Sequence, residues 1–149
     1  MSLNPFDPKT VLLAKHAQHV VLIHFPIALF IAGVGLDFVA QWTKHSGLRF
    51  AAYVNLLLAA VMVVPAVGTG LVAWQWALEG HRIKGVLLWH LVFAASSAMV
   101  IWIVCWIHFR ARREGGVNLP NNRLVLEFVG VVLLAFTGHL GGFLSGVNM

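Results

Sequence analysis

The sequence predicts an all-α fold, a bundle of four transmembrane helices that runs up, down, up and down. Of its 149 residues, 60% are hydrophobic and only 10% are charged, and the mean hydropathy of +0.86 lies outside the range of soluble domains. Crossing the hydrocarbon layer takes about 20 helical residues. Four apolar runs are long enough: 20–42, 51–78, 85–109 and 124–147. Short linkers make consecutive helices antiparallel neighbours, so residues 1–149 are expected to form one membrane domain.

The first predicted helix spans about residues 18–42. The segment before it, MSLNPFDPKT, is polar and lacks the basic, apolar and small-residue pattern of a cleaved signal peptide. We therefore expect this helix to remain in the protein and to act as its own insertion signal. The turn-like linker TKHSG leads to the second predicted helix, 51–78, in which Pro65 predicts a bend.

The third predicted helix spans about 84–109, after the linker EGHRIK, and the fourth spans about 123–146, after REGGVNLPNN. The single cysteine, Cys105, lies late in the third helix, so an internal disulfide is excluded. Small residues within the helices are expected to let the backbones approach closely in lipid. They are Gly33, Gly35, Ala94, Ser96, Ser97 and Gly130.

The distribution of charge predicts an orientation in the membrane. The basic residues behind the formal charge of +5 gather at helix ends, which indicates contact with the lipid bilayer and not with nucleic acid. The first and third linkers carry six of them, whereas the N-terminal segment and the second linker carry four. The positive-inside rule therefore predicts a multi-pass protein of the bacterial inner membrane with both termini periplasmic.

Six of the eight histidines fall in or near the outer half of the predicted bundle. Among them, His24, His90 and His139 lie at similar depths on three different helices. A single histidine in such a helix often serves as a hydrogen bond to a neighbouring helix. Three at one depth favour a ligand set, because apolar surroundings keep imidazole neutral and neutral imidazole binds metals.

Helical periodicity favours haem over a bare metal ion at these histidines. The residues that share their faces are Ala28, Ile31 and Gly35 for His24, and Ala94, Ser97 and Ile101 for His90. Several of these side chains are small and leave room for a flat macrocycle, which a compact zinc or copper site would not need. Haem b is the expected cofactor, with Arg82, Lys84 or His81 near its propionates. No CxxCH motif occurs, so covalent c-type attachment is excluded.

Several segments resemble, over the full length, a widespread bacterial family of four-helix membrane proteins known chiefly as a domain of unknown function. They are HVVLIHFPIALF (19–30) with its His-x4-His-Phe-Pro core, GTGLVAW, the region of His90, and TGHLGGFLSGV. The matching positions are His19, His24, Pro26, His90, Gly141 and Gly142. The family segment usually begins His-Pro, whereas Val20 follows His19 here. The family is similar in layout to membrane b-type cytochromes, so the resemblance implies a haem site and not a particular reaction.

The ligand pairing has two open arrangements. His19 and His24 point about 140° apart around a helix, so they cannot both face one iron. In the first arrangement, His24 pairs with His90 across the diagonal of the bundle, and His19 caps the helix or contacts a propionate. In the second, His19 and His139 hold a further haem. The expected cofactor is therefore one haem b, or two.

Asp37 and Glu127 are the two acids predicted within the membrane, where a carboxylate is costly unless it is paired or functional. The simpler interpretation is pairing with an arginine: Arg49, Arg110 or Arg123. The alternative is proton uptake beside a quinone. His108 is expected to contact lipid headgroups beside Arg110.

Three function hypotheses follow. In the first, the chain is a b-type cytochrome that transfers electrons between the quinone pool and a periplasmic cytochrome or oxidoreductase subunit, and whether it belongs to an enzyme stays open. In the second, it is a non-redox anchor or assembly subunit, alone or as a homo-oligomer, whose histidines are structural. In the third, it holds a transition metal through His16, His19, His24 and His81. No hydrolytic triad, phosphate loop or metalloprotease motif occurs.

Overall fold

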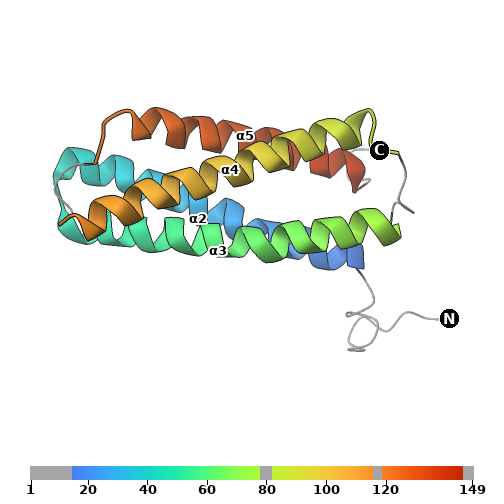
Figure 1. The fold of residues 1–149 in the computed structure, drawn as a ribbon, viewed down its shortest axis with the longest axis horizontal. Coiled ribbons are helices and arrows are strands. Elements are labelled where there is room, and N and C mark those ends of the chain that lie inside the picture. Colours follow the sequence, from blue (N-terminus) through green and yellow to red (C-terminus); the bar gives the residue numbers. More distant parts are fainter. Residues whose placement is uncertain (1–14, 78–81, 116–118, 146–149) are drawn as a thin grey trace.

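The computed structural model describes residues 15–77, 82–115 and 119–145, and these form four helices (Figure 1). The helices are α2 (Lys15–Thr43), α3 (Ser46–Ala77), α4 (Val86–Arg113) and α5 (Arg123–Leu144). Each contains a span that is long and apolar enough to cross a membrane. The predicted all-α fold with four apolar helices in sequential antiparallel contact is confirmed.

Two helices extend beyond the predicted limits, at the end of the bundle that holds the first and third linkers. α3 begins at Ser46, not at residue 51, and α4 ends at Arg113, not at residue 109. The two extensions contact each other, because the Arg112 guanidinium lies 4.7 Å from the ring centroid of Phe50 and 5.0 Å from that of Tyr53. These cation–π contacts stabilise polar helix ends that the apolar pattern alone does not reveal.

The bundle consists of two helical hairpins, α2 with α3 and α4 with α5. The hairpins meet through contacts of α3 with α4 and of α2 with α5, so α2 and α4 lie diagonally across the bundle and run parallel. Figure 1 shows the hairpins separating towards the end where α2 begins and α5 ends. The bundle is therefore wider at that end.

The middle of the bundle is a close-packed apolar core. Phe30, Leu56, Ile101 and Leu134, one from each helix, are among its buried members. The inward face of α2 follows the helical period, since Pro26, Phe30, Gly33, Asp37 and Ala40 are all buried. Core packing thus separates the wide end of the bundle from the narrow end.

Gly130 allows α5 to approach the core closely. A Cβ atom at this position would lie 2.8 Å from two ring carbons of Phe30 and 2.9 Å from Cγ1 of Val100. Phe30 is fully buried and has no room to withdraw. Gly35, by contrast, is exposed and a Cβ there would meet nothing within 4 Å, so only part of the predicted small-residue set serves close packing.

We expect Gly130→Ala to destabilise the protein by about 1–3 kcal/mol through overpacking, after a smaller offset from the better helix propensity of alanine. Gly35→Ala is the matched control and should leave stability equal or slightly higher. Unfolding of both variants in detergent, followed by circular dichroism, measures the difference. Equal stability of the two variants would contradict the close approach at Gly130.

Candidate cofactor site

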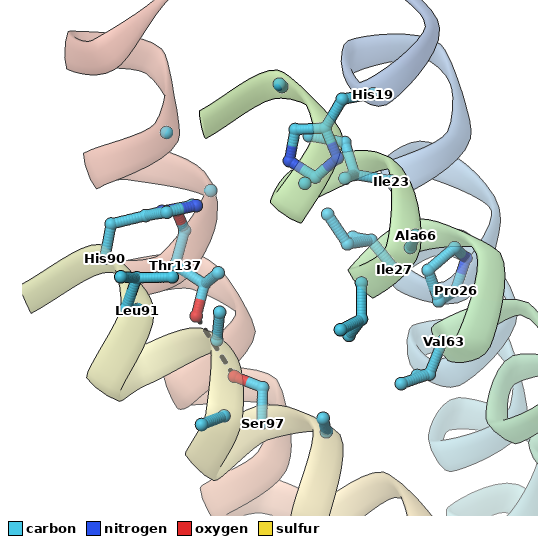
Figure 2. A pocket seen from close by; sticks show the side chains of 18 of the residues that line it. His19, Ile23, Pro26, Ile27, Val63, Ala66, His90, Leu91, Ser97 and Thr137 are labelled. Carbon is cyan, nitrogen blue, oxygen red and sulfur yellow. Dashed lines mark hydrogen bonds between the residues drawn. The ribbon is translucent and has the colours of Figure 1, made fainter. Parts of the chain in front are cut away.

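A cavity of about 260 Å³ lies at the wide end of the bundle, and all four helices contribute to its wall (Figure 2). The wall is almost entirely apolar and rich in small residues, among them Ala66, Gly70, Ala94, Ala98 and Gly138. The cavity is partly open to the outside of the bundle. An apolar or amphipathic group can therefore reach it from the surrounding lipid.

His19 and His90 both line this cavity. Each is the fifth residue of its helix, and the parallel helices α2 and α4 start at the same end, so the two side chains lie at a similar level. Figure 2 shows the two rings approaching the cavity from opposite sides. The structure thus brings together one histidine from each of two diagonal helices.

The hydrogen bond of His90 defines its tautomer. Its Nδ1 lies 3.1 Å from the backbone carbonyl oxygen of Thr137 on α5. A carbonyl oxygen only accepts hydrogen bonds, so Nδ1 must carry the proton. In the neutral ring, Nε2 then carries the lone pair.

His19 is also hydrogen-bonded to the neighbouring helix of its hairpin. Its Nδ1 lies 3.2 Å from Oγ1 of Thr69 on α3. The Thr69 hydroxyl donates its proton to its own helix, at 2.9 Å from the carbonyl of Pro65 and 3.0 Å from that of Ala66. With its proton on either carbonyl, the hydroxyl can accept a hydrogen bond from Nδ1 of His19.

Two glycines make space for these two rings. A Cβ atom at Gly70 of α3 would lie 2.9 Å from Cε1 of His19, and one at Gly141 of α5 would lie 3.2 Å from Cε1 of His90. Each histidine is thus seated against a glycine of the neighbouring helix in its own hairpin. Gly141 belongs to the C-terminal Gly-Gly motif, so part of that motif has a packing role beside His90.

The other three sequence-predicted site residues lie outside the cavity wall. His24 is exposed on α2, and its Nδ1 donates to the carbonyl of Val20 on the same helix, at 2.6 Å. His139 is exposed on α5 with its ring edge-on to Phe143. Arg82 is exposed just before α4, at the same end as the cavity.

The structure therefore does not bring His24 and His90 together, the pair that the sequence favoured. Because α2 follows the 3.6-residue period, His19 and His24 lie on different faces of the helix. The face of His19, which also carries Ile23 and Ile27, lines the cavity. The His24 face, with Ala28 and Gly35, is exposed. On α4 the expected face is correct, because Ala94, Ser97 and Ile101 line the cavity with His90.

The proposed four-histidine metal set lies partly outside the described residues, since these exclude His81 and the side chain of His16.

A second polar group lies at the narrow end of the bundle and is buried in the protein. Asp37, His108, Arg123 and Glu127 are between 0% and 4% exposed. Arg123 Nε donates to Asp37 Oδ2 at 2.8 Å, and His108 Nε2 lies 2.9 Å from Glu127 Oε1. The predicted pairing of the acids with an arginine is confirmed for Asp37 and Arg123. The predicted headgroup contact of His108 is wrong, because its side chain faces inward and bonds Glu127.

Sequence reasoning missed that these residues form one group, although the helical period carried the signal. Arg123 and Glu127 continue the buried face of Gly130 and Leu134 on α5, and His108 continues the buried face of Ile101 on α4. One ligand atom each of Asp37, His108 and Glu127 lies within 4.8 Å of the others, so this group has the composition and spacing to hold a metal ion.

Comparison with known protein families places the chain. A family model described as a predicted membrane protein (DUF2231) matches residues 15–147 and so covers all four helices. No curated protein and no solved structure matches the chain.

Proposed function

Since this chain belongs to the DUF2231 family of predicted membrane proteins, a family without an assigned activity, we propose a function from the geometry of its cavity. The chain is a membrane b-type haem protein that transfers electrons between membrane quinone and a periplasmic redox partner. His19 and His90 would hold the haem iron.

The observation that carries this proposal is the anchoring of both cavity histidines through Nδ1. Nδ1 of each ring is hydrogen-bonded, to Thr69 Oγ1 and to the Thr137 carbonyl, and an Nδ1–H tautomer leaves the lone pair of a neutral ring on Nε2. Ligating histidines characteristically donate their second ring N–H in this way, which fixes the ring and raises its basicity. Two such histidines on diagonal helices of a bundle are the ligand set of a membrane b-type cytochrome.

The cavity offers an apolar lining to a macrocycle that enters from its open side. Its volume of about 260 Å³ lies just below the range of about 300–1,000 Å³ that is typical of small-molecule sites, and its open side provides further room. The small side chains of the wall, such as Ala94 and Gly138, leave a flat group unobstructed. Arg82 and Lys84, both exposed at the same end, offer positive charge for carboxylate groups at the membrane surface.

Bound haem supplies one-electron redox chemistry. His19 and His90 would bind the haem iron through a neutral ring nitrogen. Thr69 and Thr137 fix the planes of the two imidazole rings through hydrogen bonds, and the apolar wall keeps water away from the haem. We restrict the proposal to one haem. Within the described residues, neither His24 nor His139 lines the cavity.

The non-redox alternative has one observation in its favour. The bonds of His19 and His90 each join two helices of a hairpin, α2 with α3 and α4 with α5, as structural histidines in membranes do. In that case the chain is an anchor or assembly subunit. Purified protein without haem would favour this alternative.

The electron-transfer function is tested by mixing the oxidised, purified protein with a soluble quinol analogue under anaerobic conditions. We expect the quinol to reduce the haem, as seen in the reduced absorption bands. A haem that dithionite reduces but quinol does not would contradict the proposed quinone partner.

We propose that both termini lie on the periplasmic side, because the first and third linkers carry the larger share of basic residues. Single cysteines at Lys44, Asn121 and Ile83, all exposed linker positions, test this in a Cys105→Ser background. An impermeant thiol reagent should label Ile83→Cys in intact spheroplasts and label Lys44→Cys and Asn121→Cys only after lysis. The reverse pattern would invert the topology.

A further inference from the structure

The buried group at the narrow end carries an unbalanced charge. With both carboxyls ionised, Asp37 and Glu127 contribute two negative charges and Arg123 contributes one positive charge, so these three residues carry one negative charge in excess. All four side chains lie inside a helix bundle that spans a membrane, where an uncompensated charge is costly. The group therefore requires a further positive charge, which a proton or a metal ion can supply.

Two carboxylate oxygens in this group also lack hydrogen-bond partners. Asp37 Oδ1 and Glu127 Oε2 are buried and unbonded, although the other oxygen of each carboxylate accepts a bond, from Arg123 and from His108. Asp37 is 1% exposed and Glu127 is 0% exposed, so solvent water does not satisfy these oxygens. The missing positive charge and the missing partners occur in the same place.

We propose that Asp37, His108 and Glu127 bind one divalent transition metal ion, in a site separate from the haem cavity. Two carboxylate oxygens and one imidazole nitrogen form a mixed donor set that suits Mn²⁺, Fe²⁺ or Zn²⁺. The three ligand atoms lie within 4.8 Å of one another. Two atoms on one such ion lie at most about 4.4 Å apart, twice a bond of about 2.2 Å, so at most a small side-chain rotation brings the three ligands onto one ion.

The neighbouring residues hold the ligands as a metal site requires. Arg123 Nε fixes Asp37 through Oδ2 and leaves Oδ1 for the ion. Arg123 is itself oriented by the carbonyl of Pro120 and by Oε1 of Gln41, each at 3.2 Å. His108 coordinates through Nε2 once its ring proton resides on Nδ1. The ion then links α2, α4 and α5 at the narrow end.

The test uses full-length protein in detergent, stripped of metal with a chelator and then titrated with Mn²⁺ or Zn²⁺. We expect about one tightly bound ion per chain and a higher thermal midpoint in the loaded protein. Asp37→Asn and Glu127→Gln should each weaken binding at least tenfold. Glu114→Gln and His45→Gln, at exposed positions, are the matched controls and should bind as the wild type does.

Wild-type measurements keep the proposal falsifiable if a variant fails to fold. X-ray absorption of the Zn²⁺-loaded wild type should show one nitrogen and carboxylate oxygens around the ion. The proposal would be overturned if the wild-type protein bound no more metal than Glu127→Gln. It would also be overturned if the wild type showed the infrared band of a protonated carboxyl group at saturating metal and Glu127→Gln lacked that band. The proton would then be the occupant. Haem content is measured separately and should be unchanged in Asp37→Asn and Glu127→Gln, since neither residue lines the haem cavity.

Discussion

Replacing His19 or His90 with alanine is expected to abolish the low-spin haem absorbance of the purified protein. Each substitution removes one of the two imidazoles that line the cavity from diagonal helices, and low-spin bis-histidine ligation would require both. The wall offers no replacement ligand at that level within the described residues, because His24 and His139 lie outside it. Haem content by pyridine haemochrome and the optical spectrum measure the effect.

His24→Ala and His139→Ala are the matched controls for these two variants. Both histidines are exposed, on the same two hairpins, at comparable depths. We expect both variants to retain the spectrum of the wild type. Loss of haem from His24→Ala with retention in His19→Ala would restore the pairing that the sequence favoured and would contradict ligation by His19.

Arg123→Met is expected to destabilise the metal-stripped protein by about 3–5 kcal/mol. The substitution leaves Asp37 and Glu127 buried without their cation, and breaking a buried ion pair from one side carries this order of cost. Arg123 also bonds Pro120 and Gln41, so the start of α5 loses its ties to the preceding linker and to α2. Denaturant unfolding in detergent measures the loss.

The triple variant Arg123→Met, Asp37→Asn, Glu127→Gln separates the charge effect from the loss of packing. It removes both orphaned charges together with the arginine and should recover most of the stability. Arg110→Met is the surface control, because its ion pair with Glu114 is solvent-exposed and contributes little. Equal stability of Arg123→Met and Arg110→Met would show that the buried network does not stabilise the fold.

The fold was predictable from the sequence because the membrane constrains it. Apolar runs of about 20 residues must be helices, and short linkers must make them antiparallel. The helix ends were less predictable. The start of α3 and the end of α4 depend on Arg112 packing over Phe50 and Tyr53, a contact between residues about 60 positions apart that no local pattern reports.

The helix face that lines the cavity was predictable on α4 but not on α2. His90 and its neighbours were placed correctly because Ala94, Ser97 and Ile101 repeat at helical spacing. On α2 the choice between His19 and His24 depended on which face turns inward, and both faces of this helix are apolar. Pro26 and Phe30 on the His19 side are buried by packing against the other helices, which a single sequence does not show.

The absorption spectrum of wild-type protein, purified from a haem-replete host, tests the central claim most directly. We predict a Soret band, low-spin bands that sharpen on reduction, and about one haem b per chain, with electron paramagnetic resonance typical of bis-histidine ligation. Protein that is folded and pure but shows neither a Soret band nor iron would contradict haem binding in this cavity. In that case His19 and His90 would serve as hydrogen bonds between helices.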